Sequence, residues 1–345
     1  MRRGRSPRVP AWAVLLAVVM AATACTGGGA RDSADAAMAP AARTYLSKAL
    51  DIVEEHSLRR HQVDWAALRR STFAQAQGAR GPADTYEAIE VALSRLGDRH
   101  SQFWDPAQAK EQLDPSATPV EPPRSRSLGR GVGYLALPGV DGARQTYDTY
   151  VRQGRDAVAR TDRAGACGWV VDLRGSTGGG MWPVLAVAGP LLGDGTVGAF
   201  VDADGKKSVW SVKDGSPYQD GTSAGWGAAK PLAQAVPPVA VLTGRETRSA
   251  GEAVVIAFHG RPHTRFFGEP TQGLPTGNAS YPLPDGALLL LTGAREADRT
   301  GRVHDGPIPP DEEVVKDPRP AARDRDDALD AARDWLLTQE GCRSS

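Results

Sequence analysis

The sequence has no excess of either charge and few cysteines. Lysine plus arginine and aspartate plus glutamate each number 41 among 345 residues. Because no basic excess is present to neutralise phosphates, a nucleic-acid-binding protein is disfavoured. Three cysteines are too few for a disulfide framework or a four-cysteine zinc site. No histidine–carboxylate cluster has zinc spacing either, so we expect no metal and no other cofactor.

The sequence also lacks an apolar run long enough to span a membrane comfortably. Its apolar stretch at residues 9–22 follows four arginines and precedes small residues, a pattern typical of a secretory signal. The end of this stretch resembles a bacterial lipobox, in which Cys25 would be lipidated. We therefore expect a signal or lipoprotein segment over residues 1–25 and a flexible tether over residues 26–42. An extracytoplasmic lipoprotein on the cell membrane is favoured over simple secretion and over a retained anchor.

The remaining two cysteines have two interpretations. Export would bring the chain into an oxidising compartment, where Cys167 and Cys342 could form a disulfide. Alternatively, Cys167 stands just before an apolar strand and could be a small buried residue. The sequence leaves both possibilities open.

The order of apolar patterns predicts two domains of different class. Residues 43–110 show helical periodicity, with Asp64 and Asp84 at the start of the second and third helices, and form a small N-terminal helical domain. Residues 111–128 contain four prolines and are predicted to be a linker. From residue 129 to residue 341 strands alternate with helices, which indicates an α/β domain.

Several elements of this α/β domain can be predicted individually. Strands are expected at residues 132–137, 168–173, 238–242, 265–267 and 287–291, and a hairpin at Asp204-Gly205. Helices are expected at residues 145–161, 183–192, 250–259 and 324–339.

A glycine-rich segment, residues 172–180, follows one of the predicted buried strands and precedes a helix. Glycines at such a turn allow main-chain N–H groups to face a ligand. Both phosphate-binding patterns are absent, since there is no GxGxxG and no Lys-Ser/Thr after the glycines. Taken alone, the segment indicates a structural turn.

A second strand-to-helix turn, residues 243–252, contains Ser249. At the start of a helix a serine is usually an N-cap. The same position is also suited to a nucleophile, because the helix dipole and free N–H groups would stabilise an oxyanion.

A third segment, residues 96–104, contains His100 at the predicted end of the third helix. Alone, this histidine would be a surface or capping residue. Beside a serine nucleophile it becomes a candidate general base, because a hydroxyl needs an adjacent base to attack.

Together these segments resemble the tail-specific, or C-terminal-processing, serine peptidases. The similarity is loose in each piece but specific as an ordered set. The matching pieces are Val63–Trp65, Leu96–Ser101, Gly133–Leu135, Val171–Arg174 with Gly178 and Gly179, Thr247–Glu252, Gly268–Gly273 and Gly306–Asp311.

The resemblance implies a crotonase-like (ClpP/crotonase-type) α/β peptidase domain that follows the helical domain in sequence. It implies that Ser249 is the nucleophile and that the oxyanion is bound by the backbone N–H of Ala250 and of Gly178 or Gly179. Glu252 matches a position that we interpret as structural.

Two departures from the family pattern indicate a particular branch. Leu274 and Pro275 stand where many members have a lysine base, and no PDZ-like module separates the helical and α/β regions. Both features resemble the tricorn-core-like branch, in which a histidine from the helical part serves the serine, and His100 matches that role. For the carboxylate that orients the imidazole, Asp298 and Asp305 are equal candidates, and a different partner or none is the third option.

The sequence therefore predicts an exported serine endopeptidase that cleaves peptides or proteins through a Ser–His acyl-enzyme. A non-catalytic protein that binds a ligand or peptide on the same fold is the alternative. An acyl-CoA enzyme of the crotonase type is disfavoured, because its cofactor is cytosolic and the chain has a predicted signal segment.

Overall fold

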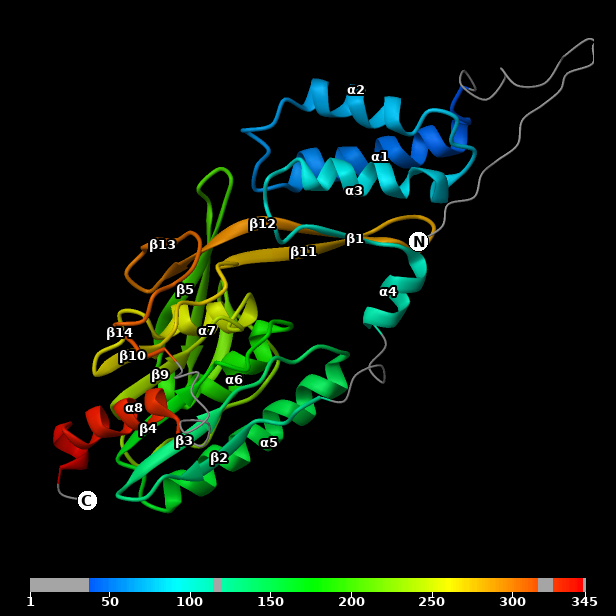
Figure 1. Ribbon diagram of the computed structural model, residues 1–345. Coiled ribbons are helices and arrows are strands. Elements are labelled where there is room, and N and C mark those ends of the chain that lie inside the picture. Colours follow the sequence, from blue (N-terminus) through cyan, green and yellow to red (C-terminus); the bar gives the residue numbers. More distant parts are fainter. Residues whose placement is uncertain (1–36, 114–119, 316–324, 344–345) are drawn as a thin grey trace, which may run out of the picture. The chain divides into compact units, whose positions relative to one another are not determined.

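A computed structural model describes residues 37–113, 120–315 and 325–343 (Figure 1). Residues from Ala37 onward group into one compact unit. The predicted signal segment with Cys25, and most of the predicted tether, lie outside the described residues. Among the helices of the described part, none combines the length and the apolar character needed to cross a membrane.

A six-stranded, mostly parallel sheet forms the centre of the α/β part. Its order is β14–β10–β9–β4–β3–β2, and only the edge strand β2 runs antiparallel to its neighbour. The strands are β2 (Arg124–Ser127), β3 (Val132–Ala136), β4 (Gly168–Asp172), β9 (Val239–Thr243), β10 (Thr264–Gly268) and β14 (Glu312–Glu313). Every residue of β4 and β9 is buried, as expected for strands that are covered on both faces.

Helices cover both faces of this parallel sheet, which confirms the predicted mixed α/β class. One face packs against α5 (Arg144–Arg163), α6 (Met181–Leu192) and α7 (Ala250–Phe258), and the other against α8 (Asp327–Leu337). Alternation along β4 sends Trp169 and Val171 into the first core and Val170 into the second. All four helices coincide with predicted ones to within a few residues.

The register of the parallel sheet brings two predicted functional turns together. In the β4–β9 pair, Asp172 lies opposite Leu242, so both strands end at the same edge. The glycine-rich loop follows β4 and the Ser249 turn follows β9. In open α/β sheets this carboxyl edge is where ligands bind.

A second, antiparallel sheet is built around the long strand β12. Its path is β1–β12–β5–β6–β7–β8, and β11 and β13 also pair with β12. The strands are β1 (Gln102–Trp104), β5 (Gly195–Asp202), β6 (Lys207–Lys213), β7 (Ser216–Gln219), β8 (Thr222–Ser223), β11 (Thr276–Pro282), β12 (Leu288–Asp298) and β13 (Val303–His304). The β5–β6 pair confirms the predicted hairpin at Asp204-Gly205. The strand predicted at residues 287–291 extends much further, to Asp298.

Three main helices form the N-terminal part (Figure 1). They are α1 (Pro40–His56), α2 (Trp65–Gln75) and α3 (Tyr86–Ser94), with a short η1 (Pro82–Thr85) before α3 and α4 (Pro106–Leu113) after β1. Asp64 caps α2 as predicted, since its Oδ1 accepts a 2.9 Å hydrogen bond from Ala67 N–H. Asp84 lies in η1 instead of capping α3, and accepts from the N–H groups of Arg80 and Gly81.

The helical part shares its core with the antiparallel sheet. Leu46, Leu50 and Ile89 from the helices belong to the same cluster as Leu289 and Leu291 of β12. Strand β1, which lies within the predicted helical domain, pairs with β12. The predicted linker likewise contains β2, an edge strand of the parallel sheet. The β1–β12 pairing therefore joins the helical part to the α/β part, and the β2–β3 pairing attaches the predicted linker to the parallel sheet.

Candidate active site

Ser249 occupies an unusual backbone conformation at the start of α7. Its φ of 50° and ψ of −116° lie far from the extended conformation that an ordinary N-cap adopts. A non-glycine residue in such a region costs of order 1–3 kcal/mol, and strain of this kind is concentrated at functional sites. A sharp strand-to-helix turn with a strained serine is the arrangement that exposes a nucleophilic hydroxyl.

Glu252 fixes this turn from inside the protein. Its Oε2 accepts hydrogen bonds from the N–H groups of Ser249 (2.9 Å) and Leu274 (2.8 Å). Its Oε1 accepts from Thr271 Oγ1 (2.6 Å) and Gly273 N–H (2.8 Å). Burial raises the pKa of Glu252, and these hydrogen bonds oppose the rise. The expected structural role of Glu252 is therefore to join the Ser249 turn to the loop at residues 271–274.

The glycine-rich loop lies directly against Ser249. Gly178 and Gly179 have φ values of 110° and 98°, which side-chain-bearing residues rarely adopt. A Cβ atom on Gly178 would lie 3.6 Å from Cβ of Ser249, and one on Gly179 would lie 2.3 Å from the carbonyl oxygen of Val140. A side chain at residue 179 would therefore collide with Val140, and the positive φ values favour glycine at both positions of the loop.

Hydrogen bonds lock the two turns in register. Thr247 Oγ1 donates to the carbonyl of Leu173 (2.9 Å), and Arg248 N–H donates to that of Ser176 (3.1 Å). The Arg248 side chain donates from Nε to the carbonyl of Thr177 (2.6 Å). The structure thus brings together the candidates Ser249, Ala250, Gly178 and Gly179.

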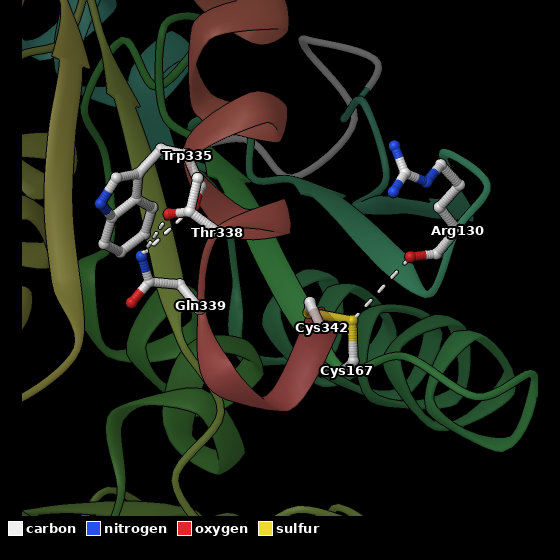
Figure 2. Close-up of a disulfide and its surroundings, with 6 residues drawn as sticks. All are labelled: Arg130, Cys167, Trp335, Thr338, Gln339 and Cys342. Carbon is white, nitrogen blue, oxygen red and sulfur yellow. Dashed lines mark hydrogen bonds between the residues drawn. A yellow bond between two sulfur atoms is a disulfide. The ribbon is translucent and has the colours of Figure 1, made fainter. Parts of the chain in front are cut away.

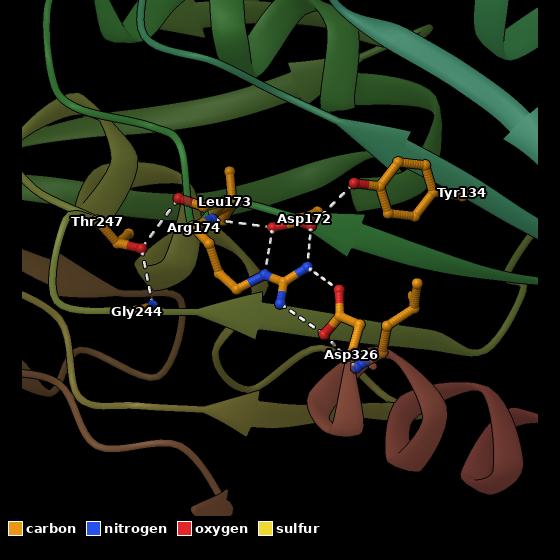
Figure 3. A network of polar contacts seen from close by, with 8 residues as sticks. Tyr134, Asp172, Leu173, Arg174, Gly244, Thr247 and Asp326 are labelled. Atoms are coloured by element: carbon orange, nitrogen blue, oxygen red, sulfur yellow. Dashed lines mark hydrogen bonds and ion pairs between the residues drawn. The ribbon is translucent and has the colours of Figure 1, made fainter. Parts of the chain in front are cut away.

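A salt-bridge network supports the start of the glycine-rich loop (Figure 3). Arg174 donates to both carboxylate oxygens of Asp172 and, at 2.8 Å each, to both oxygens of Asp326. Tyr134 Oη donates to Asp172 Oδ2 at 2.9 Å. Asp326 caps α8 through Leu329 N–H, so the network connects the loop to the C-terminal helix.

The sequence left the state of Cys167 and Cys342 open, and the structure shows them as a disulfide (Figure 2). Their Cα atoms are 5.2 Å apart. Cys167 immediately precedes β4, and Cys342 belongs to the short helix η3 (Glu340–Cys342) that follows α8. The disulfide therefore fastens the end of the C-terminal helical segment to the central strand of the parallel sheet.

His100 lies in the turn between α3 and β1, beyond the end of α3 at Ser94, and not at the helix terminus that the sequence predicted. The turn is held by Asp98, whose Oδ1 accepts from the N–H groups of His100 (3.1 Å) and Ser101 (2.6 Å). Asn278 Nδ2 donates to the His100 carbonyl at 3.0 Å.

The imidazole of His100 has a hydroxyl as its partner. Nδ1 lies 2.7 Å from Thr276 Oγ1 at the start of β11. Burial lowers the pKa of His100, Asp98 raises it and the guanidinium of Arg248 lowers it further. The ring is therefore neutral at pH 7, as a general base must be. Thr276 follows two residues after Leu274, whose N–H shares the Glu252 carboxylate oxygen with the N–H of Ser249, so a short segment connects His100 to the Ser249 turn.

Neither candidate carboxylate is hydrogen-bonded to His100. Asp298 lies 3.0 Å from His304 Nε2 and also accepts from Thr300 and from Arg302 N–H. Asp305 lines the same cavity as His100 without a hydrogen bond to it. The group that contacts His100 Nδ1 is instead the hydroxyl of Thr276, which no sequence pattern marked. His100 lies just before β1 and Thr276 begins β11, and both strands pair with β12.

The described residues contain no group of three or more histidine, cysteine or carboxylate side chains that could hold a metal ion. What the site offers instead is a serine on a strained turn, backbone N–H groups at the start of α7 and in the glycine-rich loop beside it, and a neutral imidazole. The class of protein that this fold and these groups define is a serine hydrolase with a mixed α/β fold.

Comparisons with known proteins place the chain more narrowly. Residues 131–314, more than half of the chain, match peptidase family S41, and the chain belongs to this family of serine peptidases. It is 26% identical over 301 residues to the nisin-resistance protein of Lactococcus lactis subsp. lactis. This match covers 87% of this chain and 88% of that protein.

Other relatives confirm the resemblance to C-terminal-processing peptidases. The chain is 27% identical over 265 residues to carboxyl-terminal-processing peptidase 2 of Arabidopsis thaliana, a match that covers 72% of this chain and 47% of the plant enzyme. It thus spans about half the length of that relative.

Two solved structures share the fold. One is a lipoprotein from Streptococcus agalactiae, with a TM-score of 0.72, 21% identity, and coverage of 87% of this chain and 98% of that one. The other is the photosystem II D1 C-terminal processing protease, with a TM-score of 0.59 and 16% identity. This match covers 79% of this chain and 93% of that one.

Proposed function

We propose that the protein is an exported serine endopeptidase in which Ser249 is the nucleophile and His100 the general base. The observation that supports this most directly is the left-handed backbone of Ser249 with Gly178 against it. The neutral, partly buried imidazole of His100 supports the second role. Membership of a peptidase family makes a peptide or protein the substrate.

In the proposed reaction, His100 Nε2 takes the proton of Ser249 Oγ as the oxygen attacks the peptide carbonyl. Nδ1 is engaged by Thr276, which leaves Nε2 for this transfer. The N–H groups of Ala250 and of Gly178 or Gly179 bind the oxyanion, and the loss of one such donor typically lowers the rate ~10²–10³-fold. His100 then protonates the departing amine, the C–N bond breaks, and water hydrolyses the acyl-enzyme and regenerates Ser249.

A fluorophosphonate probe tests the assignment of both residues. The wild-type protein should be labelled covalently, whereas Ser249→Ala and His100→Ala should not. Ser280→Ala, which removes an exposed serine of β11, serves as the matched control and should be labelled like wild type. Labelling that persists in Ser249→Ala would reject the nucleophile, and an unlabelled wild-type protein would favour the non-catalytic binding protein.

The location of the protein is part of the same proposal. Cys25 follows a signal-like segment, and a structurally similar protein is described as a lipoprotein. We expect Cys25 to carry the lipid and to hold the enzyme at the outer face of the cell membrane. Mass spectrometry of the mature N-terminus should show a diacylglyceryl group on Cys25, and Cys25→Ala should abolish it. A mature chain that begins elsewhere would contradict the lipid anchor.

A further inference from the structure

Strand β12 has a gap in its strand pairing at residues 291–293. On one side of β12, β11 pairs along residues 288–295. On the other side, β1 pairs with Leu288–Leu290 and β5 pairs with Ala294–Asp298, so no described strand pairs with the residues between them. Thr292 stands in the middle of this gap and is fully buried. Its backbone N–H and carbonyl therefore need partners of another kind.

Two segments of the helical part supply these partners. The N–H of Thr292 donates at 3.0 Å to Oγ of Ser101, the residue after His100. The carbonyl of Thr292 accepts at 2.8 Å from the N–H of Leu58, in the connection between α1 and α2. The gap in the sheet is therefore the place where β12 holds the turn that carries the candidate general base.

The side chain of Thr292 lies between the two residues that hold the backbone of His100. The N–H of His100 donates to Asp98 Oδ1, and its carbonyl accepts from Asn278 Nδ2. Thr292 Oγ1 lies 3.2 Å from Asp98 Oδ1 and 3.1 Å from Asn278 Oδ1. A hydroxyl has one proton, so these two acceptors share it. Thr292 thus connects the residue that binds the N–H of His100 with the residue that binds its carbonyl.

Burial and strand register make this connection firm. Thr292 has 0% of its surface exposed, so water does not compete for the hydrogen bonds of its hydroxyl. In such surroundings hydrogen bonds are stronger than in water, and neighbouring ones reinforce each other. Asn278 of β11 lies directly opposite Thr292 of β12. Because the backbone groups of Thr292 bind Ser101 and Leu58 on the other side, this is a non-hydrogen-bonded pair, in which facing side chains are closest.

We propose that Thr292 is a positioning residue for the general base, acting on the backbone of His100 through Asp98 and Asn278. It complements Thr276, whose hydroxyl contacts the imidazole ring. This inference rests on the proposed function, in which His100 takes a proton from the serine. Without the Thr292 hydroxyl the turn can shift, and a displacement of about 1 Å at a catalytic group can lower the rate ~10²-fold.

Thr292→Val tests the role in the full chain, since valine keeps the shape and removes the hydroxyl. The rate constant for fluorophosphonate labelling of Ser249 should fall at least about tenfold, and Thr292→Ser should restore it to within about threefold of wild type. Thr72→Val is the matched control, because Thr72 of α2 is equally buried and its hydroxyl donates to the carbonyl of Leu68. It should be labelled at the wild-type rate. A wild-type rate in Thr292→Val would overturn the positioning role.

Asn278→Ala tests the same network at a half-exposed position, where folding is less at risk. It should slow labelling about fivefold, while Ser280→Ala on the same strand should leave the rate unchanged. Because Thr292 and Asn278 act on one backbone, the double variant should be slowed by less than the product of the two single effects. A double variant slowed by the full product would show that the two residues act independently and would contradict the network.

Nuclear magnetic resonance of the imidazole nitrogens separates this inference from the proposed function, because it requires no reaction. In isotope-labelled Ser249→Ala we expect the neutral tautomer of His100 with the proton on Nδ1, which donates to Thr276. The additional substitution Thr292→Val should displace the ring and populate the Nε2–H tautomer, whereas Thr72→Val should not. An unchanged His100 signal would overturn the positioning role. A changed signal in a protein whose Ser249 never reacts with the fluorophosphonate would reject the peptidase mechanism and retain Thr292 as the residue that holds the His100 turn.

Discussion

At the scale of single residues, the hydroxyl of Thr276 stands where related mechanisms would require a carboxylate. Its Oγ1 is 2.7 Å from His100 Nδ1, so the imidazole has a fixed orientation without a negative charge against it. A neutral partner stabilises the imidazolium less than an aspartate does, and burial acts in the same direction by lowering the pKa of His100. The acid limb of the pH–activity profile should therefore lie below pH 6.5, the ordinary pKa of histidine. Activity should be lost as the pH falls through the pKa of His100.

Thr276→Val tests this positioning role, since valine keeps the shape and removes the hydroxyl. The loss of one hydrogen bond of about 1 kcal/mol should lower kcat roughly fivefold to tenfold, with a smaller effect on KM. Thr276→Ser should restore most of the activity. The variants and the wild-type enzyme are compared by steady-state kinetics between pH 5 and pH 9. Thr222→Val, which changes an exposed threonine of β8, serves as the control. An unchanged kcat and an unchanged acid limb in Thr276→Val would show that the hydroxyl does not position His100.

A second residue, Glu296 of β12, is buried, and its N–H donates to the carbonyl of Pro275. Its Oε2 has no hydrogen-bond partner within the described residues, and burial, together with the charge of Glu252, raises its pKa well above the ordinary value. Glu296 is therefore protonated in the folded protein but ionised in the unfolded chain once the pH exceeds about 4.5. Because the native state then binds more protons than the unfolded state, the free energy of unfolding falls as the pH rises through this window, by about 1.4 kcal/mol per pH unit.

Glu296→Gln should remove this dependence, since glutamine is neutral at every pH. We expect urea unfolding to show a flatter stability profile from pH 5 to pH 8 in the variant, with its largest gain over wild type at the alkaline end. The exposed Glu313→Gln on β14 provides the control and should leave the profile unchanged. Parallel profiles for wild type and Glu296→Gln would mean that Glu296 is ionised in the native protein.

At the scale of elements, α8 acts on the glycine-rich loop through Asp326. Two hydrogen bonds of 2.8 Å connect Asp326 with Arg174, and Arg174 also donates to both carboxylate oxygens of Asp172 (Figure 3). Arg174 and Asp326 remain about one-third exposed, so solvent screens the pair and its contribution to stability is small. The pair matters because it fixes the position of Arg174, four residues before Gly178.

Asp326→Asn should therefore affect catalysis more than folding. We expect the free energy of unfolding to fall by about 1 kcal/mol and kcat to fall several-fold with little change in KM, because the oxyanion donors act mainly in the transition state. Asp330→Asn on the same helix breaks an exposed pair with Arg333 and should change neither quantity. If the two variants had equal kcat values, the connection from α8 to the loop would be structural only.

The elements that could be predicted from the sequence are those whose patterns are local. The buried strands β4 and β9 could be predicted because each is a continuous apolar run. The turns after them could be predicted because glycine and serine follow these runs. Strands β1 and β11 could not be predicted, because half-exposed residues such as those of β11 show no apolar pattern and form a strand only by pairing with β12. For the same reason the sequence does not predict the contact between His100 and Thr276, which are 176 residues apart, whereas it does predict that Gly178 and Ser249 lie close together.

At the scale of the whole molecule, the candidate site depends on the joining of parts that the sequence suggested were separate. His100 comes from the helical part and Ser249 from the α/β part, and β12 contributes to the core that the helices share. The C-terminal segment is fastened in a comparable way, since α8 buries Ala332 and Leu336 against the parallel sheet and the Cys167–Cys342 disulfide follows directly (Figure 2).

The disulfide should stabilise the fold chiefly by restricting the unfolded chain, because it closes a loop between residues 175 positions apart. Removal of a native disulfide typically costs about 2–5 kcal/mol, and a loop of this length belongs near the upper end. Reduction should therefore lower the Tm of the wild-type protein by several degrees. Cys342→Ser should show the same lower Tm with or without reductant, which separates loss of the bond from other effects of the reagent. A wild-type Tm that does not respond to complete reduction would mean that the packing of α8 alone holds the C-terminal segment in place. The ion pair between Asp326 and Arg174 would then persist under reducing conditions.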